Sequence, residues 1–346
     1  MSRRLAPLLL LLTFVSSLIV TACASNEPGK VCAVLDTGGE NDKSFNENTL
    51  RGARDAAREH GLPFAHIVAT TSEDYVPFIN RFVEEECGLI ITVGFFMAEA
   101  TANAAMENPD IQFAIVDNAY FPGFGCADNV ESCYSDEGGL SNVTSLTFAE
   151  DEVGYLAGTL AGCMTESGII GSVAGMQIDT VERFVKGYQN GAHAYDPDVE
   201  TLNVYIPDFN DPYTGKQEGD RQIRAGADII FAAGGNTGNG GLVAAHDVGK
   251  MTIGVDVDQY FTLPEVAPSL LTSAAKNMDV AAANAVEEYA SGQLTGGIKT
   301  ADISSGGVGL APYHDWDDRI PTECKSAVSE AESAIADGLI NPMVAP

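Results

Sequence analysis

Short apolar runs alternate with amphipathic helical stretches along this chain, and the alternation restricts the possible folds more than any other feature. Apolar runs bounded by Gly, Asp or Asn are typical of buried strands. Such runs occur at Val31–Leu35, Ala65–Ala69, Leu89–Val93, Gln112–Val116, Ile169–Ala174, Thr201–Ile206, Ile229–Ala232 and Thr252–Val255. Repeated units of strand, helix and strand form parallel sheets covered by helices on both faces. The sequence therefore predicts an α/β fold with doubly wound parallel sheets.

The number of predicted strands in 346 residues favours two lobes over one large sheet. The polar stretch 122–142 is the natural break between two series of strands. The expected lobes are 31–142 plus about 273–305, and 143–272 plus about 306–346. Crossing strands near Val143 and Leu270 would then act as the hinge between the lobes.

The N-terminus resembles the export signal of a bacterial lipoprotein. Two arginines precede an apolar run from Leu5 to Val20, which has the size of a signal-peptide core. Two small residues and then Cys23 follow. We expect residues 1–22 to be removed, Cys23 to be lipidated, and residues 23–30 to tether the chain to the extracytoplasmic face of the cell membrane. The alternative is an ordinary signal peptide with an incidental cysteine.

The charge balance excludes some partners. The chain has 49 acidic and 18 basic residues, for a net charge of −31. A surface this acidic repels nucleic acid phosphates and anionic lipid headgroups. We therefore expect no nucleic acid partner and contact with the membrane through the lipid anchor only. The expected assembly is a monomer.

Six further cysteines permit three disulfides in an exported chain. They are Cys32, Cys87, Cys126, Cys133, Cys163 and Cys324. Cys126 and Cys133 flank a polar loop and form the best local pair, whereas Cys32 and Cys87 also suit buried thiols. The remaining pairing is open. No C-x-x-C occurs, so a zinc site is disfavoured and no metal or cofactor is expected.

Polar and glycine-rich segments follow several predicted strands, and in doubly wound sheets ligand groups gather at the carboxyl ends of the strands. These segments are Asp36–Asn46, Asp117-Asn118, Phe209–Pro212, Gly234–Gly238 and Gly254–Gln259. Their position predicts a small polar ligand held between two lobes.

Six motifs in order resemble the basic membrane protein family of bacterial lipoproteins, from about Val31 to about Lys276. The motifs are Gly-Gly-x-x-Asp-x-Ser-Phe-Asn at 38–46, Val116-Asp117, Tyr155-Leu156-Ala157-Gly158, Phe184 with Gly187-Tyr188, Phe209-x-Asp211-Pro212, and Gly254-Val255-Asp256-x-Asp258-Gln259. The resemblance implies a fold like that of type I periplasmic binding proteins. It also implies a purine-nucleoside ligand and delivery of that ligand to an ABC transporter permease.

The family's mode of binding implies eight ligand-binding residues. They are Asp42, Phe45, Asn46, Asp117, Phe209, Asp256, Asp258 and Lys276. Phe45 and Phe209 would stack on the two faces of the base, which contributes roughly 1–3 kcal/mol per ring. Asp117 and Asp256 would accept hydrogen bonds from ribose hydroxyls, and Lys276 would supply a cation. Asp42 and Asn46 would contact polar edges of the base. An extra residue in the 235–238 turn puts a contact from Asn236 in doubt.

An enzyme is the first rival interpretation. The Asp36–Asp42 segment lacks the D-x-D-x-x-x-D-D arrangement of calcium-dependent nucleoside hydrolases, and no phosphate-binding loop or nucleophile elbow is present. We expect binding without catalysis. A sugar- or autoinducer-binding protein, or a ligand sensor of the same fold, is the second rival.

Overall fold

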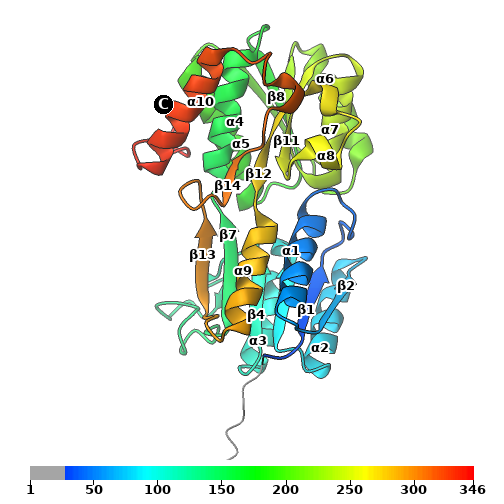
Figure 1. Cartoon of the computed structure of the whole chain (residues 1–346), viewed down its shortest axis with the longest axis vertical. Helices are drawn as coiled ribbons and strands as arrows, with labels where there is room; N and C mark the ends of the chain where they lie inside the picture. The colour runs from blue at the N-terminus through cyan, green and yellow to red at the C-terminus, as the bar shows by residue number, and fades with distance from the viewer. Residues whose placement is uncertain (1–27) are drawn as a thin grey trace, which may run out of the picture.

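The computed structural model describes residues 28–346, which fold into two lobes that each contain a six-stranded sheet (Figure 1). The expected signal peptide, the expected lipidation site Cys23 and the start of the tether lie outside the described residues. None of the helices within residues 28–346 combines the length and apolar character that a membrane span requires.

The first sheet has the strand order β13-β7-β4-β3-β1-β2, with all neighbours parallel. Its strands are β1 (Val31–Leu35), β2 (Phe64–Val68), β3 (Leu89–Val93), β4 (Gln112–Val116), β7 (Val143–Phe148) and β13 (Gly297–Ala301). The helices of this lobe are α1 (Phe45–Glu59), α2 (Tyr75–Glu84), α3 (Ala98–Glu107) and α9 (Met278–Ala290). Its short elements are η1 (Ser72–Asp74), η2 (Phe95–Met97), β5 (Phe121–Pro122) and β6 (Gly125–Cys126). β1 and β3 are buried along their whole length, as expected for parallel strands covered on both faces.

The second sheet has the order β14-β12-β11-β10-β8-β9, and only the β12–β14 pair within it is antiparallel. Its strands are β8 (Ile169–Ala174), β9 (Glu200–Tyr205), β10 (Ile229–Ala233), β11 (Met251–Asp256), β12 (Leu270–Lys276) and β14 (Val308–Leu310). The helices of this lobe are α4 (Glu150–Met164), α5 (Asp179–Tyr195), α6 (Pro212–Arg224), α7 (Gly235–Asp247), α8 (Gln259–Thr262) and α10 (Thr322–Ala336), with the short turns η3 (Ala267–Ser269) and η4 (His314–Trp316). The predicted α/β architecture is confirmed.

Within residues 28–346 the chain crosses between the lobes three times, from β7 to α4, from β12 to α9 and from β13 to β14 (Figure 1). β7 pairs with β4 in the first sheet, so the first crossing follows Phe148 rather than preceding Val143. β12 stays in the second sheet up to Lys276, a few residues beyond the expected boundary at 272. The polar stretch 122–142 resembled a linker between lobes. It is instead part of the connection from β4 to β7, two strands of the first sheet.

Glycines allow α4 and α5 to pack backbone against backbone. A Cβ at Gly158 would lie 1.9 Å from the carbonyl oxygen of Tyr188, and one at Gly191 would lie 2.0 Å from that of Tyr155. Larger residues would force the helices apart. The Tyr155–Gly158 motif and the Gly187-Tyr188 motif therefore serve the core of the second lobe, and Tyr188 is only 1% exposed.

Three disulfides join Cys32 to Cys87, Cys126 to Cys133, and Cys163 to Cys324. The predicted Cys126–Cys133 pair is confirmed and closes the loop that begins at the end of β6. Cys32 and Cys87 are bonded to each other rather than free thiols, because β1 and the start of β3 lie side by side. The third bond fastens α10 to α4.

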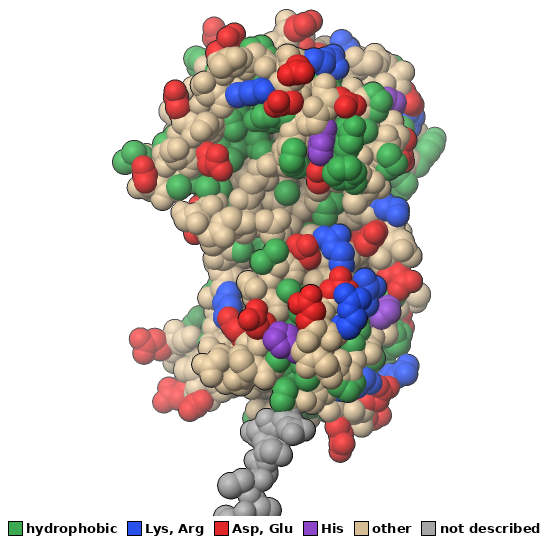
Figure 2. Space-filling view, viewed as in Figure 1, with side chains coloured by type: hydrophobic (Ala, Val, Ile, Leu, Met, Phe, Trp, Pro, Cys, Tyr) green, Lys and Arg blue, Asp and Glu red, His purple; other side chains and the backbone are tan. Residues whose placement is uncertain are grey.

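Acidic side chains are scattered over both lobes in the view of Figure 2, in keeping with the net charge of −31. Mutual repulsion of these charges opposes the compact state, and salt screens it over about 10 Å at 0.1 M and about 3 Å at 1 M. We expect the melting temperature, measured by circular dichroism, to rise by several degrees between 0.05 and 1 M NaCl. Sucrose at matched osmolarity is the control, and a flat or falling salt curve would contradict the expectation.

Candidate functional site

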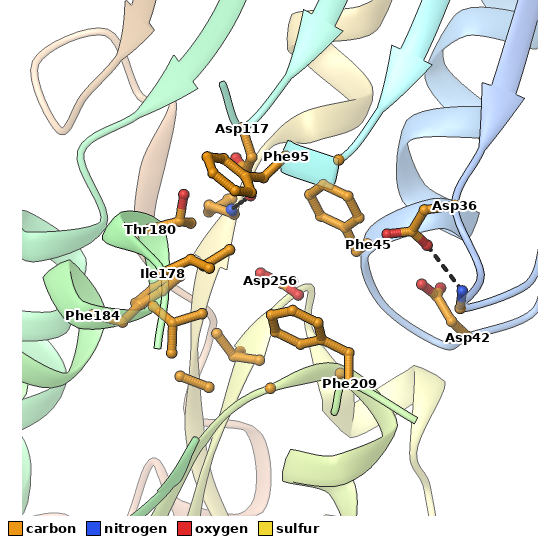
Figure 3. Close-up of a pocket in the computed structure, with 18 of the residues that line it drawn as sticks. Asp36, Asp42, Phe45, Phe95, Asp117, Ile178, Thr180, Phe184, Phe209 and Asp256 are labelled. Carbon is orange, nitrogen blue, oxygen red and sulfur yellow. Dashed lines mark hydrogen bonds and ion pairs between the residues drawn. The ribbon is translucent and has the colours of Figure 1, made fainter. Parts of the chain in front are cut away.

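A pocket lies between the two lobes, at the carboxyl ends of the parallel strands (Figure 3). It encloses about 750 Å³ of empty space, open solvent at its mouth included. This is the place where doubly wound sheets bind ligands. Its charged and aromatic lining consists of Asp36, Asp42, Phe45, Phe95, Phe96, Asp117, Phe184, Phe209, Asp256 and Lys276. The pocket therefore lies at the strand ends, where the sequence analysis expected a ligand between two lobes.

Two phenylalanines line the pocket from opposite lobes. Phe45 is the first residue of α1, and Phe209 follows β9. Figure 3 shows their rings on either side of the space between the lobes. The Phe209 ring lies against Gly175, where a Cβ would approach it to 2.4 Å. A planar ligand between two such rings would be contacted on both faces.

The loop that carries Phe209 is held by the start of α6. Asp211 caps the helix by accepting a hydrogen bond from the Thr214 backbone N–H at 3.0 Å, and Pro212 occupies the first helical position. Thr237, at the start of α7, donates its hydroxyl to the Asp208 carbonyl at 2.8 Å. The Phe-x-Asp-Pro motif therefore fixes the loop while Phe209 faces the pocket.

Asp42 lines the pocket and also organises the start of α1. Its carboxylate accepts backbone N–H groups from Ser44, Asn46 and Glu47 at 3.0, 2.8 and 3.1 Å. Burial raises the pKa of Asp42 to about 6, although these hydrogen bonds act in the opposite direction. The same carboxylate thus stabilises the start of α1 and lines the pocket.

Asn46 does not line the pocket among the described residues, and it is fully buried. Its amide donates to Oδ1 of Asp36 at 2.7 Å, and the Gly38 N–H donates to the same oxygen at 2.9 Å. Asp36, which is part of the lining, is therefore the group at this position that faces the ligand space. Asn46 is the second residue of α1, and its amide is directed at Asp36, so its role is to orient that carboxylate.

Asp117 directly follows β4 and Asp256 is the last residue of β11, and both have left-handed backbone angles, with φ of 60° and 66°. Such angles are uncommon outside glycine and mark positions held by their surroundings. Oδ2 of Asp256 accepts the Ser44 hydroxyl at 2.5 Å, which joins the two lobes. Oδ1 of Asp117 is buried and accepts no hydrogen bond from any described residue. It is an acceptor without a donor, at the edge of the pocket.

Lys276 is the one basic side chain among the described residues that line the pocket, and it is 1% exposed. Its Nζ lies 2.6 Å from Oδ2 of Asp117 and 3.5 Å from Oε1 of Glu150. Burial alone would lower the pKa of Lys276, but the carboxylates of Asp117, Glu150 and Asp256 outweigh it and raise that pKa above its ordinary value. The lysine therefore stays charged at neutral pH.

Charges of alternating sign extend from Lys276 through Glu150 to Arg183 within the second lobe. Arg183 on α5 lies 3.3 Å from Oε2 of Glu150 and also pairs with Asp151. The phenylalanines at positions 45, 148 and 184 surround the Lys276 ammonium, with ring centroids 5.4, 5.1 and 5.6 Å from Nζ. The ammonium is thus held by acids and by aromatic faces.

Asp258 lies outside this pocket. Its Oδ2 pairs with Nε2 of His314 at 2.7 Å, and its Oδ1 accepts the Tyr260 backbone N–H at the start of α8. It lines a second, more open cavity on the other side of Asp256. Asp256 lines both cavities, whereas Asp258 lines only the second.

The sequence reasoning missed several charged or aromatic residues at the site, among them Asp36, Phe95, Phe96, Phe184 and Glu150. Asp36 directly follows β1, and Phe95 and Phe96 come just after β3, so a systematic reading of strand ends would have included them. Glu150 also comes just after a strand, β7, but its pairing with Lys276 has no local signal, because the two residues are remote in sequence. Asn236 does line the pocket, and its amide donates to Asn210 at 2.8 Å.

Comparison with known proteins gives one family. Residues 30–337 match the model of the Bmp family, described as PnrA-like ABC transporter substrate-binding proteins. The nucleoside-binding protein BmpA of an ABC transporter of Lactococcus lactis is 30% identical over 330 residues, covering 90% of this chain and 88% of its own. A lipoprotein of Pyrococcus furiosus is 31% identical, over 87% of this chain and 74% of its own.

Among solved structures, a solute-binding protein of an ABC transporter system from Aeropyrum pernix superposes with a TM-score of 0.80. It is 25% identical and covers 92% of this chain and 94% of its own. The similarity extends over both lobes and confirms the expected two-lobed binding-protein fold.

Proposed function

The chain belongs to the Bmp family of PnrA-like ABC transporter substrate-binding proteins, and we propose that its ligand is a purine nucleoside, which it carries to the permease. The observation that supports this ligand most directly is the presence, in one pocket, of two aromatic rings and a carboxylate oxygen that has no donor among the described residues. Phe45 and Phe209 can stack on a base, while Oδ1 of Asp117 awaits a donor. A relative, BmpA of Lactococcus lactis, carries the name nucleoside-binding protein.

The polar groups of the pocket suit a ribose. Ribose hydroxyls donate hydrogen bonds, and carboxylate acceptors bind such donors more strongly than neutral ones. Asp117 can accept through its unpartnered oxygen, and Asp256 through the oxygen that Ser44 does not occupy. Lys276 donates to a ring or hydroxyl oxygen from beside Asp117.

The same charges disfavour nucleotides. Of the residues that the structure describes, four aspartates line the pocket, at positions 36, 42, 117 and 256, against one basic residue, Lys276. Two carboxylates already pair with that lysine. A phosphate would enter a site of surplus negative charge, which is discrimination by repulsion.

The proposal includes the location and the working cycle. The protein is exported, cleaved before Cys23, acylated on that residue, and held outside the membrane as a monomer that does not alter its ligand. The first described residues precede β1, at the far end of the first lobe from the pocket (Figure 1). A tether at that end leaves the pocket free to open. The opening is a rotation about the three crossings, in which residues 31–148 and 277–301 move together as the first lobe.

We expect calorimetry to detect adenosine, guanosine or inosine binding, with no heat from ribose alone. Phe209→Ala should weaken that binding roughly 5- to 150-fold, because stacking contributes roughly 1–3 kcal/mol per base. Tyr213→Ala is the matched control, since Tyr213 is 72% exposed on the neighbouring helix. Equal affinity in wild type and Phe209→Ala would place the base elsewhere, and free hypoxanthine formed from inosine would contradict a binding-only role.

A further inference from the structure

We propose that Phe96 is the gate of the pocket: its ring closes on Phe209 across the mouth and sets how fast a bound nucleoside leaves. The identity of the ligand in this statement rests on the proposed function, whereas the closing contact belongs to the protein alone. Phe96 lies on the first lobe and Phe209 on the second. Their ring centroids are 6.2 Å apart with planes at 62°, which is an edge-to-face contact.

The exposures of the interlobe contacts distinguish the mouth from the interior. Ser44 and Lys276 are each 1% exposed, so the polar contacts to Asp256 and Asp117 lie deep between the lobes. Phe96 lines the same pocket but is 39% exposed. One part of its ring therefore faces the ligand space and another faces solvent. A ligand that leaves past this ring must first separate it from Phe209.

The backbone before Phe96 is built to place the ring there. Gly94 has φ of 112°, and a Cβ on it would lie 2.9 Å from Oδ2 of Asp36. Only glycine adopts this turn without strain at such a close approach. The turn ends β3 and starts η2, so that Phe95 and Phe96 are presented at the carboxyl end of the sheet.

An aromatic series supports the gate from behind. The Phe95 ring meets Phe96 at 5.9 Å and stacks on Phe124 at 6.1 Å, with planes 11° apart. Phe124 in turn stacks on Tyr120 at 6.1 Å, and Tyr120 is 3% exposed. The Cys126–Cys133 disulfide closes the loop that follows. Phe96 is thus backed by a fixed wall of the first lobe.

This position predicts a kinetic effect. The contact between Phe96 and Phe209 forms only after the lobes close, so it does not affect the encounter of the open protein with its ligand. It must break before release, so its loss should appear in the dissociation rate. A residue that only shaped the lobe would change both rates or the stability.

The test is stopped-flow fluorescence with 2-aminopurine riboside on wild type, Phe96→Ala, Phe96→Leu and Phe121→Ala. Phe121 belongs to the same aromatic series, is 60% exposed and does not line the pocket, so it is the control. We expect Phe96→Ala to release the probe roughly three to ten times faster, with an unchanged association rate. Phe96→Leu should be intermediate, and Phe121→Ala should match wild type. An unchanged release rate in Phe96→Ala overturns the gate, as does an equal acceleration in Phe121→Ala.

A second measurement uses no ligand. Small-angle scattering of the ligand-free proteins should give a larger radius of gyration for Phe96→Ala than for wild type and Phe121→Ala, because one interlobe contact is lost. If wild type binds no nucleoside, the proposed function fails, and this comparison alone decides on the gate. Equal radii would then overturn it.

Discussion

Replacement of Lys276 by methionine is expected to lower the free energy of unfolding by about 3–5 kcal/mol and to abolish nucleoside binding. Methionine fills a similar space among the surrounding phenylalanine rings, so the cost arises from charge. Asp117 and Glu150, 9% and 4% exposed at their side chains, would lose their cation in the interior. Burial already raises the pKa of Glu150, and without the lysine it would bind a proton more readily.

Urea unfolding followed by circular dichroism measures this effect. Lys299→Met is the matched control, because Lys299 pairs with Glu288 on the surface, and exposed pairs contribute roughly 0–1 kcal/mol. The double variant Lys276→Met/Asp117→Asn removes both charges of the closest pair and should recover part of the stability, although not the binding. If the two single lysine variants lose stability equally, the buried ion pair has no special role.

The second large effect concerns the Cys163–Cys324 disulfide, whose cysteines are 161 residues apart in sequence. A cross-link over a longer loop restricts the unfolded chain more, and a loop of this length corresponds to about 5 kcal/mol in the chain-entropy model. Replacement of both cysteines by alanine should therefore lower the melting temperature strongly. It should leave nucleoside affinity unchanged, because α10 packs on the outer side of α4, away from the pocket (Figure 1).

Removal of the Cys126–Cys133 bond is the internal comparison. Its cysteines are 7 residues apart, for which the same model gives about 2.5 kcal/mol. Calorimetric melting of the two double variants should rank them in that order. The reverse order would mean that native-state packing, rather than loop length, governs these bonds.

The fold was largely accessible from the sequence because buried parallel strands are nearly continuous apolar runs. The predicted run Leu89–Val93 coincides with β3, and the predicted run Gln112–Val116 coincides with β4. Membership of a sheet was less accessible. Val143–Phe148 reads the same whichever lobe it joins, and only its pairing with β4 assigns it to the first. Local pattern identifies a strand, whereas long-range pairing places it.

The location of the candidate site could be predicted from the sequence because the carboxyl ends of the strands converge there. Phe45, Phe209, Asp117, Asp256 and Lys276 all line one pocket, and their contact with the ligand stays a prediction from the resemblance. The direction of each side chain was not accessible. The Asn46 amide donates to Asp36 and does not face the pocket. Asp258 lines a different cavity, although it is only two residues from Asp256. Glu150 faces Lys276 only because two of the three crossings lie side by side.

The position of Lys276 has a consequence for how cargo could be handed over. The residue ends β12, immediately before the chain crosses to α9 in the first lobe. It therefore belongs both to the hinge about which the lobes would rotate and to the proposed ligand site. A partner that rotates one lobe against the other would pull the Lys276 ammonium away from Asp117 in the same motion. Opening of the lobes would then itself weaken the contacts that hold the ligand, and no further conformational change between the outer surface and the binding site would be needed.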